Sequence, residues 1–524
     1  MNERFIARRR LLRGAATLSA GGTLAQPLTR LLPGAGPLGA TGAALLPQAA
    51  RSGAHPEASP LDAWADAFAD FHESYGPTTI SFDRPLPADL NGTLYRNGPA
   101  RMRRGDTAYQ HWFDGDGMVH AFGIDGRSLR HRGRMVLTDK YLAEEKAGRF
   151  LRPGFGSRIA DSLPIAKPDD INVANINVLP LGDELLALWE AGSPWRNDPE
   201  SLQTLGPKVW TDETDGAAFS AHPKVDTDGT VWSFGYLAGS GKLVLYRLDP
   251  RGNLRATRLI DASNADMVHD FAITRRYLVF VLMPLVFDRE APRGDDSFLD
   301  KLSWRPERAG TVLLVDKDTF EVAHRFETAP TAFFHIGNAW EDGDNVRIHL
   351  MRIDDFDGLM GNLAASLQRR AATPPAHTGP AEMVVDLRNR RAEVRSLSRE
   401  TAEFPRIDPR HVGRRTQSMF VASRSAAMPE GLFGMNVVAR MDTASGHMQR
   451  FDFGGETLVE EHVFVPRAGA PEGSGWLVGT AWNRVTRQTT FSVFDAAAVD
   501  AGPLAQATLP YGLPLGLHGT FVAA

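Results

Sequence analysis

A strand-like apolar run, a turn led by Asp and a second strand-like run recur along this chain from about residue 80 onward. The turns begin at Asp125, Asp249, Asp316, Asp386, Asp442 and Asp495. Successive turns lie 124, 67, 70, 56 and 53 residues apart, so the first interval is about twice as long as the others. Repeats of this length, each containing one antiparallel hairpin, are typical of the blades of a β-propeller. Seven such blades would account for roughly 450 residues.

The remaining pattern also indicates an all-β fold. Most apolar runs are short, rich in Val, Leu, Phe and Thr, and interrupted by Gly, Asp, Asn or Pro. Helical patterns are confined to 60–74 and 359–370. A large β-sandwich with ordinary Asp turns is the alternative. We predict one seven-bladed β-propeller over residues 59–524.

The composition limits the chemistry available to this chain. Its 524 residues include no cysteine, which excludes disulfides, thiolate zinc sites, iron–sulfur clusters and cysteine nucleophiles. Any bound metal must therefore be held by carboxylates or by some of the 15 histidines. Lys and Arg number 58 against 63 Asp and Glu, and no basic block occurs in the main part. This balance argues against nucleic acid as a partner.

The first 58 residues differ from the rest. They contain seven Arg and no Lys, and Glu3 and Glu57 are their only acids. The run Ala7–Arg13 has two arginines, a further residue, two apolar residues and a base, followed by a mildly apolar stretch. This resembles a twin-arginine export signal, which predicts a periplasmic or otherwise exported protein. A membrane anchor is the alternative, but Arg30 and several Gly and Pro residues interrupt the apolar stretch.

Four histidines lie within apolar or small residues: His222, His269, His335 and His518. A single histidine of this kind is usually a core residue, and the intervals of 47, 66 and 183 residues are not those of a local metal motif. On separate propeller blades, however, all four could face the central axis. Neutral imidazoles without thiolates suit a first-row ion such as iron, zinc or copper.

Several segments carry a resemblance to a known family. Asn91–Pro99 followed by His111–His120 resembles the opening motifs of the carotenoid cleavage oxygenases, and the likeness continues to the C-terminus. The other matching blocks are Leu186–Glu190, the four histidine segments, Glu403–Arg410, Val463–Arg467 and Leu517–Gly519. The resemblance implies a seven-bladed propeller, with a dome of loops and helices over the axial face that bears one ferrous ion per chain.

The resemblance also assigns the residues of the metal site. The implied iron ligands are His222, His269, His335 and His518, and the implied outer carboxylates are Glu190, Glu403 and Glu461. A carboxylate behind a ligating histidine fixes the tautomer and orientation of its ring and offsets part of the ion's charge. The sequence does not say which glutamate serves which histidine.

The implied reaction is the cleavage of a conjugated C=C bond by dioxygen to give two carbonyl products, with no protein acid or base required. Lignostilbene-cleaving members have Lys where this chain has Trp189, which favours a carotenoid or apocarotenoid over a stilbene in the substrate tunnel. Stilbene cleavage, a four-histidine zinc hydrolase and a propeller that binds its ligand without catalysis are the alternatives.

Two positions depart from the family pattern. Ile176 replaces a Thr near the open coordination positions, where a larger apolar side chain would crowd or dry the oxygen site. His462 replaces a Pro after the third glutamate, and we expect it to be a solvated loop residue.

The remaining motifs are interpreted as structural or as surface features. The strings 97–99 and 114–117 suit tight turns, and the spacing of an EF-hand calcium loop is absent. We expect His111 and His120 to pack without binding metal. Because carotenoids are insoluble, we expect peripheral membrane contact, with 150–155 and 283–287 as candidate loops.

Overall fold

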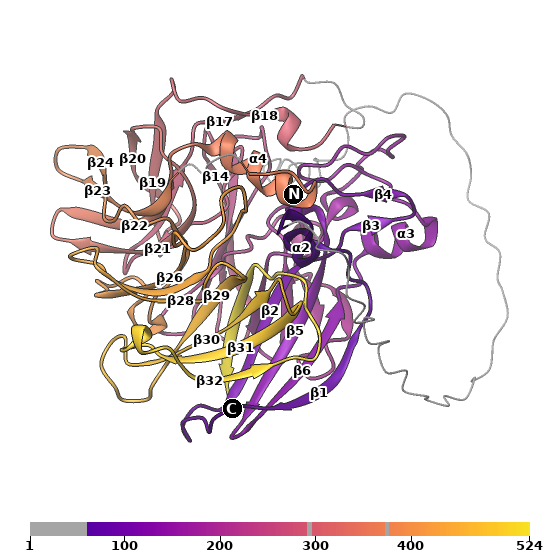
Figure 1. The fold of residues 1–524 in the computed structure, drawn as a ribbon. Coiled ribbons are helices and arrows are strands. Elements are labelled where there is room, and N and C mark those ends of the chain that lie inside the picture. The colour runs from indigo at the N-terminus through magenta and orange to yellow at the C-terminus, as the bar shows by residue number, and fades with distance from the viewer. Residues whose placement is uncertain (1–59, 291–295, 373–376) are drawn as a thin grey trace.

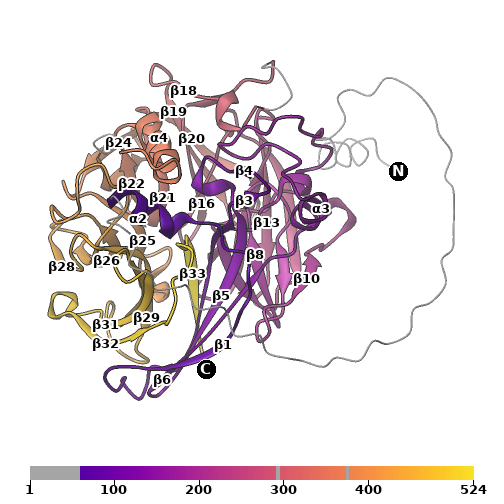
Figure 2. The same cartoon turned by 45° about the vertical axis from the view of Figure 1, so that its right-hand side comes forward.

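Seven antiparallel sheets surround a central axis in the computed structural model, which describes residues 60–290, 296–372 and 377–524 (Figures 1 and 2). The predicted all-β seven-bladed propeller is confirmed. The predicted export segment and its arginine motif lie outside the described residues. No helix among the described residues is long and apolar enough to span a membrane.

Six of the sheets contain four strands each. From the innermost strand outward, the first sheet contains β7 (Asn177–Leu181), β8 (Glu184–Leu188), β9 (Trp195–Asn197) and β10 (Thr204–Pro207). The second contains β11 (Lys224–Val225), β12 (Val231–Tyr236), β13 (Lys242–Leu248) and β14 (Leu254–Asp261). The third contains β15 (Ala272–Ile273), β16 (Tyr277–Leu282), β19 (Gly310–Asp316) and β20 (Val322–Thr328). The next three are β21 (Ala332–Asp342), β22 (Asn345–Ile353), β23 (Thr378–Asp386) and β24 (Arg391–Ser396); β25 (Ala402–Arg406), β26 (Ser418–Ser423), β27 (Val437–Asp442) and β28 (Met448–Asp452); and β29 (Thr457–Pro466), β30 (Gly475–Asn483), β31 (Gln488–Asp495) and β32 (Pro503–Thr508).

The seventh sheet joins the two ends of the described chain. Its strands, from the axis outward, are β33 (His518–Ala523), β2 (Gly92–Arg101), β5 (Asp116–Asp125), β6 (Ser128–Met135) and β1 (Tyr75–Ser81). The C-terminal β33 pairs with β2 in antiparallel register from Asn97 opposite His518 to Gly92 opposite Ala523. This pairing closes the ring of blades, and it leaves His518 at the axial end of the innermost strand.

The six predicted Asp turns all connect the third and fourth strands of a blade, counted from the axis. In most of them the carboxylate accepts main-chain N–H groups within the turn, as Asp249 does from Arg251 and Asn253. The doubled first interval contains a seventh turn of the same kind. There Asp198 joins β9 to β10 and accepts from the N–H of Ser201. The two strands have only three and four residues, so their sequence signal is weak.

Short helices and loops cover one end of the propeller, at the top of Figure 1, as the predicted dome requires. They include α2 (Pro60–Ala65), the 3-10 turns Asp66–Phe68 and Trp112–Asp114, α3 (Asp139–Ala147) and α4 (Phe356–Leu367). The two-stranded ribbons β3 (Arg103–Arg104) with β4 (Thr107–Ala108) and β17 (Leu285–Phe287) with β18 (Leu302–Trp304) complete this layer.

The helix predictions are correct in place but not in extent. The first helical segment ends at Phe68 rather than at residue 74, and α4 begins three residues before the predicted start. Asp355 caps α4 by accepting from the N–H of Gly358, which explains the earlier start. Helix α3 was not predicted, because it is mostly polar and buries chiefly Tyr141 together with the charged Lys140 and Glu144.

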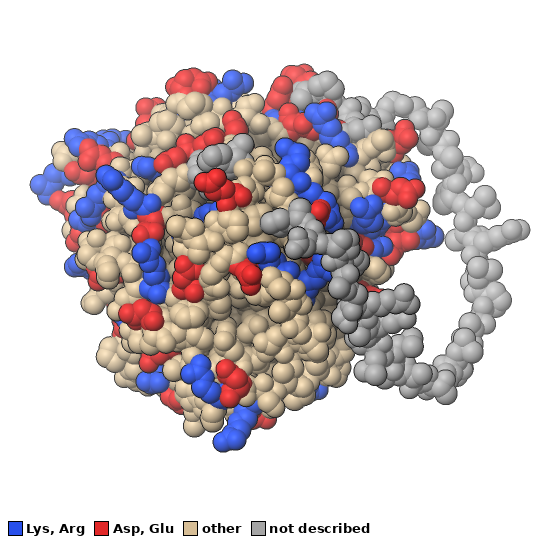
Figure 3. All heavy atoms as spheres, in the orientation of Figure 1, with Lys and Arg blue, Asp and Glu red and all other residues tan. Residues whose placement is uncertain are grey.

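The apolar side chains of the two candidate membrane loops are largely buried, although Phe155, Val286 and Phe287 are partly exposed, so membrane contact through these loops stays a prediction. Phe150 is 1% exposed and stacks on Tyr109, and Leu285 is fully buried in the main core. On the face shown in Figure 3, basic and acidic side chains are interspersed, and a largely uncharged area lies over β30–β32.

Candidate metal centre and active site

The four predicted histidines meet on the propeller axis. His222 and His269 lie just before the inner strands β11 and β15, His335 is on β21, and His518 begins β33. All four are buried, and the nitrogen atoms that they offer lie within 4.8 Å of one another. The sequence intervals between them are long because each histidine belongs to a different blade.

The Nε2 atoms of these rings point toward a common centre. The Nε2 of His269 lies 3.0 Å from that of His222 and 3.3 Å from that of His335. The Nε2 atoms of His335 and His518 are 3.1 Å apart. Nitrogen ligands at about 2.1 Å from a metal, set at right angles, are about 3 Å apart. The spacing therefore fits a metal ion held by four imidazoles.

Three glutamates contact the opposite sides of three rings. The Nδ1 atoms of His269 and His335 each lie 2.6 Å from a carboxylate oxygen, of Glu190 and Glu403 respectively. The Nδ1 of His518 lies 2.9 Å from Glu461 Oε1. Among the described residues, His222 has no carboxylate partner.

These contacts fix the tautomers of three histidines. A carboxylate accepts the Nδ1–H proton, which leaves the Nε2 lone pair of the same ring free for a metal. Lone pairs at this spacing repel one another unless a cation lies between them. The donor set therefore fits a divalent first-row ion, and the outer glutamates fit the role that the resemblance implied.

Burial keeps two of the rings neutral. It lowers the pKa of His222 well below its usual value, and the three neighbouring imidazoles add to this effect. Burial also lowers the pKa of His518 to about 4, although Glu461 opposes the shift. Burial lowers the pKa of His335, but the carboxylates of Glu403, Asp270 and Glu461 together outweigh it, so that the pKa is raised.

Further residues support two of the three glutamates, and sequence reasoning missed them. The Tyr236 hydroxyl donates to Glu190 Oε1 at 2.7 Å. Arg406 donates to Glu461 Oε2 and to the Gly519 carbonyl, both at 2.6 Å. Arg406 lies within the matched block that begins at Glu403, so the block itself was the available signal.

Phe404 is held in an uncommon conformation beside the centre. Its φ of 57° is in the left-handed region, which is rare for a bulky residue. Its ring lies 5.6 Å from that of His335 and 5.4 Å from that of His518. Strain of this kind collects at functional sites, and here it places an aromatic wall against two ligands.

His462 is not a solvated loop residue, and the prediction for it is wrong. It lies within β29, is 6% exposed, and packs its ring against Phe494. Its Nδ1 is 3.0 Å from the Glu460 carbonyl oxygen. A Cβ on the facing Gly479 would lie 2.6 Å from the His462 ring, so glycine provides the space for it. Glu461 still contacts His518.

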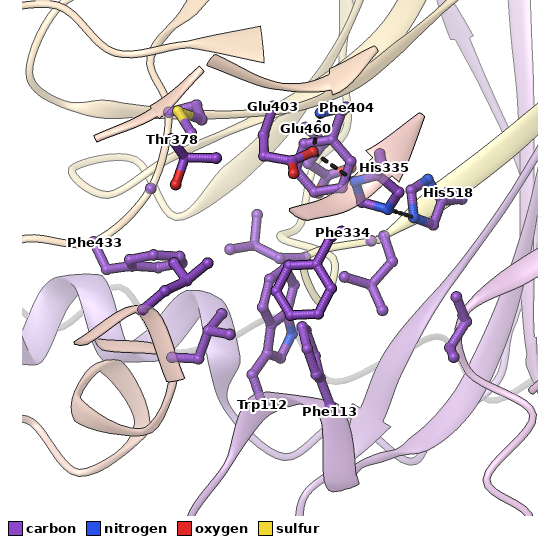
Figure 4. A pocket seen from close by; sticks show the side chains of 18 of the residues that line it. Trp112, Phe113, Phe334, His335, Thr378, Glu403, Phe404, Phe433, Glu460 and His518 are labelled. Atoms are coloured by element: carbon purple, nitrogen blue, oxygen red, sulfur yellow. Dashed lines mark hydrogen bonds and ion pairs between the residues drawn. The ribbon is translucent and has the colours of Figure 1, made fainter. Parts of the chain in front are cut away.

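A largely apolar pocket leads to the histidines. Trp112, Phe113, Phe334 and Phe404 line it near His335, whereas Thr378 and Phe433 lie on the side away from His518 (Figure 4). Trp189 and Ile176 both line this pocket, and the Ile176 carbonyl accepts from the His518 N–H at 3.2 Å. Their proposed effects on substrate and oxygen remain predictions.

Residues 97–99 lie within β2, and Gly98 does not have a positive φ, so the tight turn predicted there is wrong, whereas Asp114 ends a 3-10 turn. The polar side chains of both motifs are paired with other parts of the fold. Asn97 donates to the carbonyl oxygens of Ala174 and Asn177. Asp114 accepts from Gly156 and Ser157, and Asp116 forms buried ion pairs. His111 and His120 are buried outside the four-histidine group, as predicted.

Similarity to known proteins agrees with this geometry. The chain is 29% identical to the apocarotenoid-15,15'-oxygenase of Synechocystis sp. over 88% of this chain and 96% of that protein. It is 30% identical to carotenoid 9,10(9',10')-cleavage dioxygenase 1 of Phaseolus vulgaris over 83% of this chain and 85% of that protein. It is 28% identical to lignostilbene-alpha,beta-dioxygenase isozyme III of Sphingomonas paucimobilis over 85% of this chain and 94% of that protein.

Solved structures give the same result. Cobalt-substituted Synechocystis ACO aligns with a TM-score of 0.77 at 26% identity, over 88% of this chain and 99% of that one. A model of the retinal pigment epithelial membrane protein family, RPE65, matches residues 69–523. Relatives in this group are named oxygenases of carotenoid, stilbene and isoeugenol substrates. The chain therefore belongs to the RPE65/carotenoid cleavage oxygenase family and is an oxygen-incorporating oxidoreductase.

Proposed function

We propose that this chain is a non-haem ferrous dioxygenase that cleaves a conjugated C=C bond of a carotenoid or apocarotenoid into two carbonyl products. The observation that carries the proposal is the convergence of four imidazole Nε2 atoms beside an apolar, aromatic-lined pocket. The names of the carotenoid- and apocarotenoid-cleaving relatives support this choice of substrate.

Bound ferrous iron supplies the activation of dioxygen, and one oxygen atom ends in each carbonyl product. His222, His269, His335 and His518 would hold the ion. The three glutamates accept the Nδ1–H protons and keep the rings oriented. The apolar walls bind the polyene and exclude excess water. The net reaction transfers no proton, so it requires no protein acid or base.

The pocket contacts favour this chemistry over hydrolysis by a four-histidine zinc site. A hydrolase needs a carboxylate base beside the metal. Glu190, Glu403 and Glu461 are already bonded behind the ligands. Glu460 also lines the pocket, but it is paired with Arg96 and Thr480. Stilbene cleavage is the alternative within the family, and Trp189 in the pocket favours a polyene.

Metal binding provides the first test. His335→Ala should abolish the binding of one ferrous ion per chain, because it removes a ligand. Glu403→Gln should lower metal affinity about 10- to 100-fold, since the amide keeps an acceptor but loses the charge. Chelator competition on anaerobically purified protein measures both effects. His324→Ala, in the outer strand β20, is the control. Unchanged iron content in His335→Ala would refute the ligand assignment.

Labelled dioxygen provides the second test. Iron-loaded protein incubated with an apocarotenal under ¹⁸O₂ should yield two carbonyl products, each with one labelled oxygen, detected by mass spectrometry under conditions that limit exchange with water. A lignostilbene is the parallel substrate. Cleavage of the stilbene alone would favour the alternative substrate class. Absence of product from both, with iron fully loaded, would leave a binding protein without this activity.

We also propose that the protein is exported through its twin-arginine motif. Replacing both Arg8 and Arg9 by Lys should retain the protein in the cytoplasm of a bacterium with that export system, because the paired arginines are what the route recognises. Cell fractionation with immunoblotting measures the distribution. Arg30→Lys is the matched control. An unchanged distribution in the double variant would contradict the proposal.

Peripheral membrane contact is proposed through a surface next to residues 150–155, where the Leu163 N–H donates to the Leu151 carbonyl oxygen at 2.7 Å. Five large apolar side chains are 40–51% exposed: Leu137, Leu142, Leu163, Ile165 and Leu205. Their segments adjoin, because the Leu137 N–H donates to Thr204 and Lys167 pairs with Asp139 at the start of α3. Exposed apolar groups in one area favour insertion into a bilayer surface.

Sedimentation with lipid vesicles tests this surface. Leu142→Ser together with Ile165→Ser should reduce the vesicle-bound fraction several-fold, because it removes apolar groups from the surface. Val485→Ser, at an exposed position outside these segments, is the control. Equal sedimentation of both variants would argue against this surface as the contact.

A further inference from the structure

Arg424 brings a positive charge to the pocket on the side away from the histidines. It follows β26 directly and is one of the lining residues. Its Nη1 donates to the Gly434 carbonyl oxygen at 3.0 Å. Gly434 follows Phe433, which lies on the side of the pocket away from His518 (Figure 4). The guanidinium therefore lies beside the segment of Phe433 and Gly434, on the side of the pocket away from His518.

Within the described parts of the chain, Arg424 forms no ion pair with a carboxylate. Its two acceptors are the main-chain carbonyl oxygens of Gly434 and Pro429, at 3.0 and 3.1 Å. In contrast, the other arginine near the pocket, Arg96, is paired with Glu460. Carbonyl groups satisfy two of the five N–H donors of Arg424 but leave its charge without a counter-ion.

Burial lowers the pKa of Arg424, but a guanidinium stays protonated at neutral pH. A partly desolvated charge without a counter-ion is unfavourable, and an anionic ligand relieves that cost. The planar guanidinium matches the two oxygens of a carboxylate. The lining around it includes Leu432 and Phe433, so the rest of the ligand must be apolar.

We propose that Arg424 binds the carboxylate end group of an elongated apolar substrate, which makes polyene acids such as apocarotenoic acids the preferred class. This inference rests on the proposed function, because it places the polyene in the pocket that leads to the histidines. The acid would lie with its charged end at Arg424 and its conjugated chain toward the metal centre.

Arg424 also stabilises the segment 424–434 through its contacts with the carbonyl oxygens. The test must therefore distinguish a role in binding the ligand from a role in stabilising this segment. Arg440 is a matched control. It donates to Ser418 Oγ and to the Ala497 carbonyl oxygen, it has no carboxylate partner among the described residues, and it lies outside the pocket. Loss of either arginine removes hydrogen bonds to neutral acceptors, but only Arg424 faces the pocket.

The experiment measures ligand binding by iron-loaded protein without oxygen, so that no turnover occurs. A polyene acid, its methyl ester and its alcohol, all of one chain length, are titrated by quenching of tryptophan fluorescence. The acid should bind at least tenfold more tightly than the ester. Arg424→Met should weaken the acid about 10- to 100-fold, as expected for loss of a hydrogen bond to a charged group, and leave the ester within about threefold. Arg424→Lys should keep part of the preference.

Two results would overturn the inference. The first is equal binding of acid and ester by the unaltered protein. The second is an equal loss of affinity for all three ligands in Arg424→Met, which would show that the residue only supports the segment. Arg440→Met should leave the ratio of acid to ester unchanged. Admission of oxygen then tests the proposed function separately, since bound acid that is never cleaved would refute the activity and not the recognition of the carboxylate.

Discussion

Mutual repulsion between imidazole Nε2 lone pairs on the propeller axis is the constraint around which this structure is organised. The Nε2 atoms of neighbouring rings lie 3.0–3.3 Å apart, and no proton is available to bridge the three rings whose Nδ1–H is given to a carboxylate. A cation between them converts this repulsion into attraction. The scaffold therefore holds four rings in an arrangement that a bound cation would stabilise.

Each blade of the propeller contributes one residue to this arrangement, either a histidine or a glutamate. Four sheets supply the histidines, and the other three supply Glu190, Glu403 and Glu461. Because inner strands of neighbouring blades pack side by side, a ligand cannot move without displacing an adjacent sheet. Pairing of β33 with β2 both closes the ring and positions His518. The strand pairing that closes the fold therefore also brings the fourth histidine to the other three.

Much of this could be predicted from the sequence, and the failures have physical causes. Repeated Asp turns predict the blades, but Asp198 was missed because the strands beside it are very short. The family resemblance implied the four histidines and three glutamates that the structure brings together, but not which glutamate contacts which histidine. Glu190 and His269 come from sheets that lie two positions apart, so their contact depends on the order of the blades around the axis. His462 was expected in a solvated loop, but it lies within β29, where the pairing with β30 is irregular between Val459 and His462, and its side chain is buried.

The charges around the pocket explain why Arg424 affects the kind of ligand that the pocket binds. A divalent ion at the four histidines, together with Arg406, would balance the three glutamates, so an occupied centre would be close to neutral overall. Arg96 and Glu460 balance one another in the same way. Arg424 is then the charge at the pocket that has no carboxylate counter-ion among the described residues. In an otherwise apolar enclosure, such a charge costs free energy in the absence of ligand and regains it when an anion binds. The same electrostatics that keep the metal centre neutral therefore favour a substrate that is apolar along its length and negative at one end.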